Sequence, residues 1–408
     1  ATASVVNGVI IVEDKLKPSE NTSTTIEKKI TYNGLELFAE NLSFYVRLFY
    51  DKECTKPATE LKEIKIVNAM SGKVTFDNLE AGRTYYAGEC DARCNRVVRW
   101  SAMVNRQVLK NQRLEVTIRL PGSQPESERF DSSCVVEQVL LDGEHTFCQP
   151  EQKIASRVTC WGFGLNAEFD MNDVARKARK GELFPKPGVG LMTQIEDNRP
   201  YDMWKHYEIA RYPKKWACGP DWIEFTEEQP ECLGISLKII RRLSLRGNEI
   251  HLQTEIRNTG SVRAEFSEYQ HNFVAIDDLP VQKGYRLEIP FDQTIDQLPE
   301  RFVLQSDYTA RAESSVRVEG QTVIWTDGMD GKAYHKTTPA EKIADLPSYG
   351  WKLFHDQSPA SVQETMDFKP WRLVLWGVEH CICPEVYCRI CVDPGETQTY
   401  TRHWIFES

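Results

Sequence analysis

Short stretches in which apolar and polar residues alternate recur along this chain, and each ends at a turn signal. The clearest, 250–257, alternates Ile, Leu, Thr and Ile with polar residues and stops at Asn258-Thr-Gly260. Similar runs occupy 113–120, 235–239 and 386–392. A period of two is that of a half-buried β-strand. The pattern therefore predicts an all-β chain of antiparallel sandwiches, with its best helix candidate at 171–180, and argues against doubly wound or (β/α)8 folds.

The length of the chain predicts two domains. At 408 residues it exceeds what one hydrophobic core usually supports. The segment Leu120-Pro-Gly-Ser-Gln-Pro-Glu-Ser-Glu128 has the composition of a linker. We therefore expect a small β-sandwich over 1–122, a linker over 123–128, and a larger β-domain over 129–408.

Charge and hydropathy exclude two classes of partner. A formal net charge of −10 disfavours nucleic acid, which is bound through clustered basic side chains. No apolar run approaches the roughly 20 residues that cross a bilayer. The many aromatic residues (10 Trp, 15 Tyr and 17 Phe) suit both sandwich cores and sugar binding. Neither nucleic acid nor a membrane-spanning segment is therefore expected.

The chain has twelve cysteines, which are compatible with disulfides or with buried reduced thiols. The sequence therefore does not determine the redox state of these cysteines. Four of them, Cys381, Cys383, Cys388 and Cys391, have a spacing that resembles a metal site. Zinc needs four converging ligands, but on strands Cys381 and Cys383 share a face while Cys388 and Cys391 point oppositely. We therefore predict no metal and no cofactor.

The segment 25–95 resembles the CnaB-type, prealbumin-like modules of Gram-positive surface proteins. The resemblance is carried by 73–91, which is typical of two strands joined by an Asn/Gly turn, together with 42–50 and 29–34. It implies an extracellular or cell-surface location, the alternative being cytoplasmic. Such modules often carry a Lys–Asn isopeptide bond beside a buried acid. Glu89 matches the acid and Lys28 or Lys29 the amine, but Ile118 stands where the asparagine is wanted, so no bond is expected.

From about residue 129 onward the chain resembles the aldose 1-epimerase, or galactose mutarotase-like, superfamily. The resemblance rests on 245–260 with its Asn-Thr-Gly turn, on Phe266-Ser-Glu-Tyr-Gln-His-Asn-Phe273, on 141–147, on 184–190 and on 383–396. It implies a β-supersandwich that binds a monosaccharide or oligosaccharide in a concave groove. It also implies His271 as general acid and Glu385 as general base, with Glu379 as a rival for the base.

The chemistry of anomer exchange explains this pair. Opening a pyranose hemiacetal removes the anomeric hydroxyl proton and protonates the ring oxygen, so one acid and one base suffice. The substrate contacts implied are Glu168, Lys186, Tyr269 and Asn272. A histidine usual in the family is missing from 161–169, where Glu168 is the expected replacement. The alternatives are a non-catalytic carbohydrate-binding surface protein and a polysaccharide lyase on a related sandwich.

Overall fold

The computed structural model describes residues 2–6, 9–12, 22–32, 35–36, 42–51, 56–66, 71–79, 85–90, 106–123, 126–151, 162–297, 310–311, 315–329 and 332–408. Contacts divide the chain into two units. The first comprises Ala1–Val104, Gly122–Pro125 and Gln152–Val158, and the second comprises Asn105–Pro121, Glu126–Glu151 and Thr159–Ser408. Within the described residues, no helix combines the length and apolarity that a membrane span requires.

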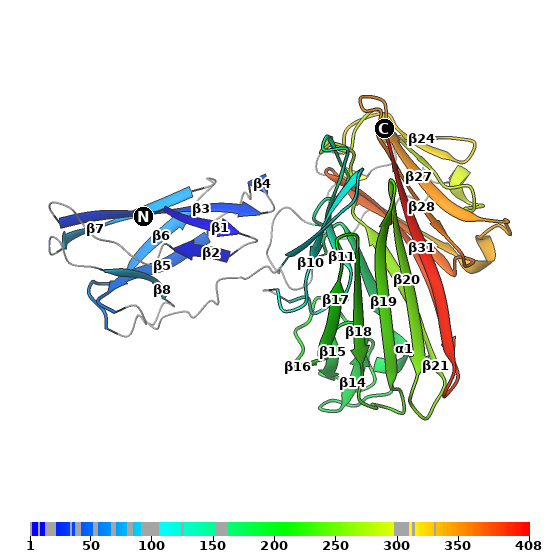
Figure 1. Cartoon of the computed structure of the whole chain (residues 1–408), viewed down its shortest axis with the longest axis horizontal. Coiled ribbons are helices and arrows are strands. Elements are labelled where there is room, and N and C mark those ends of the chain that lie inside the picture. Colours follow the sequence, from blue (N-terminus) through cyan, green and yellow to red (C-terminus); the bar gives the residue numbers. More distant parts are fainter. Residues whose placement is uncertain are drawn as a thin grey trace. The chain divides into compact units, whose positions relative to one another are not determined.

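The described part of the first unit consists of two small sheets (Figure 1). One contains β1 (Thr2–Val6), β2 (Val9–Val12), β3 (Thr22–Tyr32), β4 (Leu35–Glu36) and β7 (Ser71–Leu79), and the other contains β5 (Leu42–Phe49), β6 (Lys62–Ile66) and β8 (Tyr86–Cys90). The CnaB-type likeness remains a prediction. The side chains of Lys28, Lys29 and Glu89 lie outside the described residues, while Ile118 belongs to the second unit.

Two ten-stranded sheets form most of the second unit as far as it is described. Sheet 1 has the order β23 (Ala310–Arg311), β26 (Lys332–Pro339), β29 (Arg372–Val378), β30 (Cys381–Val392), β21 (Ala264–Asn272), β13 (Leu165–Asp170), β11 (Val135–Leu141), β10 (Leu114–Arg119) and β9 (Arg106–Lys110), with β12 (His145–Thr146) beside β11. Sheet 2 has the order β17 (Lys214–Cys218), β18 (Trp222–Glu228), β19 (Leu237–Arg246), β20 (Glu249–Asn258), β31 (Thr397–Glu407), β28 (Ser361–Met366), β27 (Tyr349–His355), β22 (Tyr285–Glu288), β25 (Thr322–Trp325) and β24 (Val316–Glu319).

Smaller elements complete the described part of this unit. They are a three-stranded sheet of β14 (Leu183–Lys186), β15 (Gly190–Thr193) and β16 (Ile209–Arg211), the helix α1 (Asn172–Ala175), and the 3-10 turns η2 (Ile295–Gln297) and η4 (Ala340–Lys342). The helix is shorter than the predicted 171–180. The last helical hydrogen bond is donated by the Arg176 N–H to Asn172, and the N–H groups of Lys177 and Ala178 bind carbonyls only three residues earlier, as in a turn. The all-β prediction is confirmed.

The alternating runs become strands whose apolar side chains fill the space between the two large sheets. In β20 the buried residues are Ile250, Leu252, Thr254, Ile256 and Asn258, and the intervening ones are partly or fully exposed. One core cluster joins Leu252 of sheet 2 to Val116 and Val386 of sheet 1. Burial of a side chain such as Leu252 contributes about 1.5–3 kcal/mol. Figure 1 shows β20 beside β31, its partner from the end of the chain.

The strand β10 marks a difference from the predicted domain boundary. It pairs with both β9 and β11, so the run 113–120 joins sheet 1 although the sequence placed it before the linker. Its buried residues Leu114, Val116 and Ile118 belong to the core of the second unit. The contacts therefore place the division before β9, near residue 105.

A buried charge network also lies between the two sheets. It runs through Lys214, Asp131, Arg241, Glu268, Arg402 and Glu364. All six side chains are at most 2% exposed. The Lys214 and Arg241 cations outweigh the opposing effect of burial and hold the pKa of Asp131 below its ordinary value. Because buried charges need partners, this network fixes which sheet 1 residues face sheet 2.

Candidate functional site

The candidate site lies on the face of sheet 1 that points away from the buried charge network. Side chains alternate between the two faces of a strand. Glu268 and Asn272 of β21 contact the residues of sheet 2, so Tyr269 and His271 point to the other face. Strand pairing aligns Glu168, Tyr269, Tyr387 and Arg372 in one row across β13, β21, β30 and β29.

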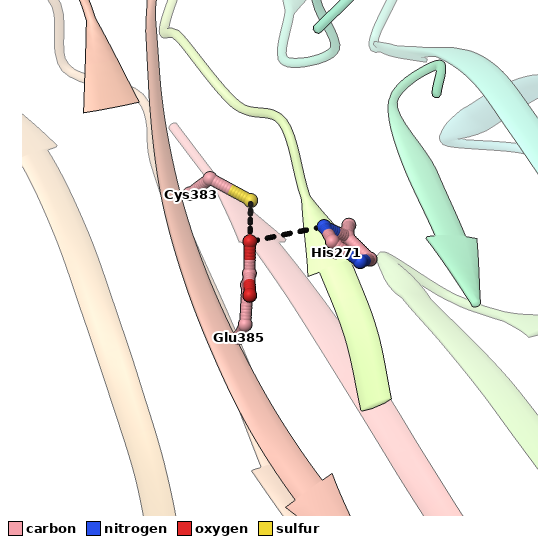
Figure 2. A group of neighbouring side chains, drawn as sticks. All are labelled: His271, Cys383 and Glu385. Atoms are coloured by element: carbon pink, nitrogen blue, oxygen red, sulfur yellow. Dashed lines mark hydrogen bonds and ion pairs between the residues drawn. The ribbon is translucent and has the colours of Figure 1, made fainter. Parts of the chain in front are cut away.

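His271 and Glu385 lie in the next row, two residues along from Tyr269 and Tyr387 respectively. The His271 Nδ1 atom is 3.0 Å from Glu385 Oε1. A dashed line marks this contact in Figure 2. Neither ring nitrogen of His271 has a partner in hydrogen-bonding geometry, so the contact with Glu385 is an ion pair when the imidazole is protonated. Cys383, on β30, donates from its Sγ to the same Glu385 oxygen at 3.7 Å (Figure 2). His271 and Glu385 thus lie in contact on one face of sheet 1, and their roles as acid and base stay a prediction.

A second carboxylate lies on the other side of the imidazole. Glu168 Oε2 is 3.4 Å from His271 Nε2. Arg129 Nε binds Glu168 Oε2 at 2.6 Å, and Lys186 Nζ lies 3.2 Å from Oε1. Arg129 is also paired with Glu151 at 3.1 Å. Both carboxylate oxygens of Glu168 therefore have partners: Arg129 and His271 contact Oε2, and Lys186 contacts Oε1.

These contacts set the protonation of the cluster. Burial favours the neutral form of Glu168, but Arg129 and Lys186 outweigh it and hold its pKa well below the ordinary value of 4.5. Burial likewise acts to lower the pKa of His271, but Glu385 and Glu168 outweigh it and raise that pKa above 6.5. His271 is therefore suited to donate a proton near neutral pH.

Aromatic rings enclose His271. The ring centroids of Tyr269, Phe130 and Phe273 lie 4.6, 4.9 and 5.3 Å from that of the imidazole. His271 is 1% exposed and Glu385 is 7% exposed. A reactant therefore reaches the pair only if one of these rings moves, and Phe130 lies in the irregular segment between β10 and β11.

Two adjoining cavities open beside this cluster. The first, of about 240 Å³, is lined by the row Glu168, Tyr269, Tyr387 and Arg372, together with Arg129, Lys186 and Tyr201. The second, of about 350 Å³, contains Trp371, Glu265 and Arg389. Both are lined by Asp170, Met171, Asn172 and Arg372. Together they have the size of a small-molecule site, but neither His271 nor Glu385 lines them.

The structure brings most of the sequence-predicted site residues together. Glu168, Lys186 and Tyr269 line the first cavity, next to His271 and Glu385. Asn272 lies on the opposite face, where its side-chain amide donates to Glu364 and Pro384 and accepts from Trp404. It is fully buried there and does not line the cavity, because a one-residue step along a strand reverses the side-chain direction.

The alternative base, Glu379, lies outside this cluster. It is an exposed residue in the turn between β29 and β30. His145, another histidine upstream, forms an ion pair with Asp277 at 3.0 Å. Glu385, in contrast, lies 3.0 Å from His271, so it is the carboxylate that the geometry favours as partner of this histidine.

Sequence reasoning did not identify four residues of the site: Arg129, Tyr387, Arg372 and Cys383. Tyr387 and Cys383 flank Glu385 at two-residue spacing on β30, so a period of two counted from Glu385 would have indicated both. Arg129 and Arg372 carry no such signal. They come from segments whose positions depend on long-range strand pairing.

His271, Cys383 and Glu385 are also the described residues whose donor atoms come close enough to hold a metal ion. One ligand atom from each lies within 4.8 Å of the others. Burial and the Glu385 carboxylate raise the pKa of the Cys383 thiol well above its ordinary value. The thiol therefore keeps its proton and serves Glu385 as a hydrogen-bond donor. The four-cysteine site weighed from the sequence is not formed, because Cys388 packs in a different core cluster from Cys381 and Cys383.

The structure shows the redox state of eight of the twelve cysteines. The eight cysteines of the second unit that the structure describes are all free thiols. Those in the second unit that pack in the core behave as small apolar side chains.

We predict that His271 stabilises the second unit below neutral pH and progressively less above it. Its raised pKa means that the folded state keeps a proton that the unfolded chain releases near pH 6.5. This stabilisation is complete below that pH and is lost as pH rises through the folded-state pKa. Urea unfolding between pH 6 and pH 9 should show this decline in the wild type and not in His271→Gln. Parallel curves for the two proteins would contradict it.

Comparison with known proteins gives weak similarities. No protein-family model matches the sequence, and no curated protein matches it. Among solved structures, a galactose mutarotase-like protein from Lactobacillus casei is 13% identical, with a TM-score of 0.45 over 74% of this chain and 100% of that one. An aldose epimerase homologue from C. elegans is 9% identical, with a TM-score of 0.42 over 74% and 98%. A TPR-domain containing protein from Parabacteroides distasonis is 10% identical, with a TM-score of 0.39 over 95% and 56%.

Proposed function

We propose that the second unit binds a sugar in the first cavity and interconverts its anomers, with Glu385 as general base and His271 as general acid. One observation carries the proposal. A histidine whose pKa is raised by its neighbours lies 3.0 Å from a carboxylate, on one sheet face and beside a cavity. These are the proton donor and acceptor that hemiacetal opening requires.

The proton transfers balance without any cofactor. Glu385 accepts the proton of the anomeric hydroxyl, and the electron pair of that O–H bond forms the carbonyl at C1. The bond between C1 and the ring oxygen breaks, and the ring oxygen takes a proton from protonated His271. After rotation about the C1–C2 bond, the ring oxygen returns its proton to His271 while attacking C1. Glu385 then gives its proton to the new anomeric hydroxyl, which restores both residues.

Entry of the sugar separates the two residues that are in contact in its absence. In this proposal one of the rings around the imidazole, such as Phe130 with its centroid at 4.9 Å, is displaced and His271 becomes accessible from the cavity. The Glu168 carboxylate accepts from a sugar hydroxyl. Burial raises the pKa values of Tyr269 and Tyr387 well above 10, so both phenols stay protonated and can donate. Apo contacts that rearrange in the reactive complex are common in acid–base sites.

The test is to follow anomer exchange in freshly dissolved α-aldoses by polarimetry and by NMR exchange spectroscopy. The wild-type chain should accelerate exchange of at least one aldose above the buffer rate, with activity falling as pH rises through the pKa of His271. Saturation-transfer NMR on the same panel reports binding independently. Sugar binding without accelerated exchange would reject the catalytic proposal.

A non-catalytic carbohydrate-binding function is the second candidate, and one observation favours it. His271 and Glu385 are 1% and 7% exposed and do not line either cavity. If Phe130 does not move, a ligand in the first cavity meets polar side chains such as Glu168, Lys186 and Arg372 but neither His271 nor Glu385. The binding and exchange measurements above separate the two functions.

A further inference from the structure

A cysteine, a histidine and a glutamate lie together on one face of sheet 1. Cys383 and Glu385 are two residues apart on β30, so their side chains share a face. His271 comes from the neighbouring strand β21, whose pairing with β30 runs up to Gln270 and Val386, the residues next to His271 and Glu385. Dashed lines in Figure 2 join both the thiol and the imidazole to the same carboxylate. Two paired strands therefore bring sulfur, nitrogen and oxygen donors into one group.

The separations of these donor atoms are close to those of ligands around one zinc ion. His271 Nδ1 lies 3.0 Å and Cys383 Sγ lies 3.7 Å from Glu385 Oε1. One ligand atom from each residue lies within 4.8 Å of the other two. Zinc–ligand bonds of about 2.0–2.3 Å at tetrahedral angles place neighbouring ligand atoms roughly 3.3–3.6 Å apart. Small side-chain rotations therefore suffice to bring all three atoms onto one ion.

The surroundings of His271 favour a metal ion at its Nδ1 atom. The imidazole is buried, and neither ring nitrogen has a partner in hydrogen-bonding geometry. Nδ1 faces Glu385, while Nε2 faces the Glu168 carboxylate at 3.4 Å. A histidine that binds a metal usually donates its other ring N–H to a carboxylate, which holds the ring in place. Glu168, itself fixed by Arg129, is positioned to accept from Nε2, which leaves Nδ1 to the ion.

We infer that His271, Cys383 and Glu385 bind one Zn²⁺ ion, with a fourth coordination position open to water or to a small ligand. A thiolate, an imidazole and a carboxylate together suit zinc, whereas magnesium and calcium require oxygen ligands. Of the four-cysteine motif weighed from the sequence, this site uses only Cys383.

Charge balance makes a buried ion acceptable at this position. Zinc binds the thiolate form of cysteine and the neutral form of histidine, so ligation releases the thiol proton of Cys383 and the imidazolium proton of His271. One divalent ion then replaces two protons, and the net charge of the buried group does not change. An uncompensated charge would be costly there, because all three side chains are buried.

A zinc ion at this position prevents the proposed acid–base chemistry. It occupies a ring nitrogen of His271 and a carboxylate oxygen of Glu385, the two groups that exchange protons with the sugar. The ion is also much smaller than a sugar, so it reaches the pair with less movement of the surrounding rings. Inhibition by zinc rests on the proposed function, whereas zinc binding does not.

Zinc binding is tested with the full chain after treatment with a chelator. The protein is loaded with Zn²⁺ and separated from unbound ion, its zinc content is measured by atomic emission, and calorimetry gives the affinity. The wild type should retain one zinc ion more per chain than Cys383→Ser. The affinity of this site should fall about 100-fold or more in the variant, because even residues that only support a metal ligand contribute roughly 10- to 100-fold. With Co²⁺ as the probe, the wild type should show a thiolate-to-cobalt charge-transfer absorption that Cys383→Ser lacks.

The matched control is Cys388→Ser. Cys388 is a buried thiol on the same strand, but it packs in a different core cluster, so this variant should bind zinc as the wild type does. His271→Gln should lose the ion as Cys383→Ser does, and it provides the same comparison if Cys383→Ser does not fold. Equal zinc content and affinity in the wild type and in Cys383→Ser would overturn the inference. Displacement of the zinc by an excess of Mg²⁺ would also overturn it.

Anomer exchange separates this inference from the proposed function. An aldose whose exchange the wild type accelerates should return to the buffer rate once zinc is bound, and a chelator should restore the acceleration. Undiminished exchange with zinc bound would overturn the inference and leave the proposed function standing. Zinc binding through Cys383, without accelerated exchange of any aldose, would overturn the proposed function and leave the zinc site standing.

Discussion

Replacing Glu385 by glutamine is expected to lower the rate of anomer exchange by about 10²–10⁴-fold, the usual contribution of a positioned acid or base. Glutamine keeps the shape of the side chain and a carbonyl oxygen for Cys383 and His271, but it cannot accept the anomeric proton. It also removes one of the two carboxylates that raise the pKa of His271. Base and acid are thus impaired together, while sugar binding in the cavity should change little.

The matched control for this substitution is Glu379→Gln. Glu379 was the other carboxylate that the sequence offered as base, and it is exposed in the adjacent turn. NMR exchange rates at saturating sugar should be near wild type in Glu379→Gln and near the buffer rate in Glu385→Gln. Equal rates in the two variants would exclude Glu385 as the base.

Replacing Arg402 by methionine is expected to destabilise the second unit by about 3–5 kcal/mol, the cost of removing one partner from a buried ion pair. Arg402 is fully buried and binds Glu268 at 2.7 Å and Glu364 at 2.8 Å. Methionine fills a similar volume but leaves both carboxylates without their main cation. Glu268 retains only the 3.5 Å contact with Arg241.

Denaturant unfolding followed by tryptophan fluorescence measures this effect, because every tryptophan except Trp100 belongs to the second unit. Arg389→Met serves as the control, since its pairing with Glu265 is at the surface, with side chains 41% and 49% exposed. A surface pair contributes about 1 kcal/mol or less. Similar losses in the two variants would show that burial of the network does not matter.

The sequence predicted the strands of the second unit well, because residues that alternate between apolar and polar in the sequence also alternate between the buried and the exposed face of each strand. The run 250–257 became β20, and 113–120 became β10. The sheet to which β10 belongs could not be predicted, because strand pairing joins residues far apart in the chain. The predicted boundary at 123–128 followed composition, whereas the side chains of β10 are buried in the core of the second unit.

The sequence could predict a site residue only where the family resemblance or the strand periodicity indicated it. His271 and Glu385 came from the resemblance, and their 3.0 Å contact depends on the pairing of β21 with β30. Asn272 was grouped with His271 because the two are adjacent in sequence, but adjacent residues of a strand face opposite ways. Arg372 was missed because its place beside Tyr387 follows from the register between β29 and β30.

The alternation in β21 makes this strand serve two purposes at once. Its even-numbered residues Glu268 and Asn272 bind Arg402 and Glu364 between the two sheets, whereas its odd-numbered residues face the other way, where Tyr269 lines the first cavity and His271 packs against Tyr269. A single-residue insertion or deletion within β21 would exchange these roles, turning an imidazole toward Arg402 and an acid toward the ligand. Length changes can therefore be tolerated in the turn at 259–263 but not in the strand that follows it.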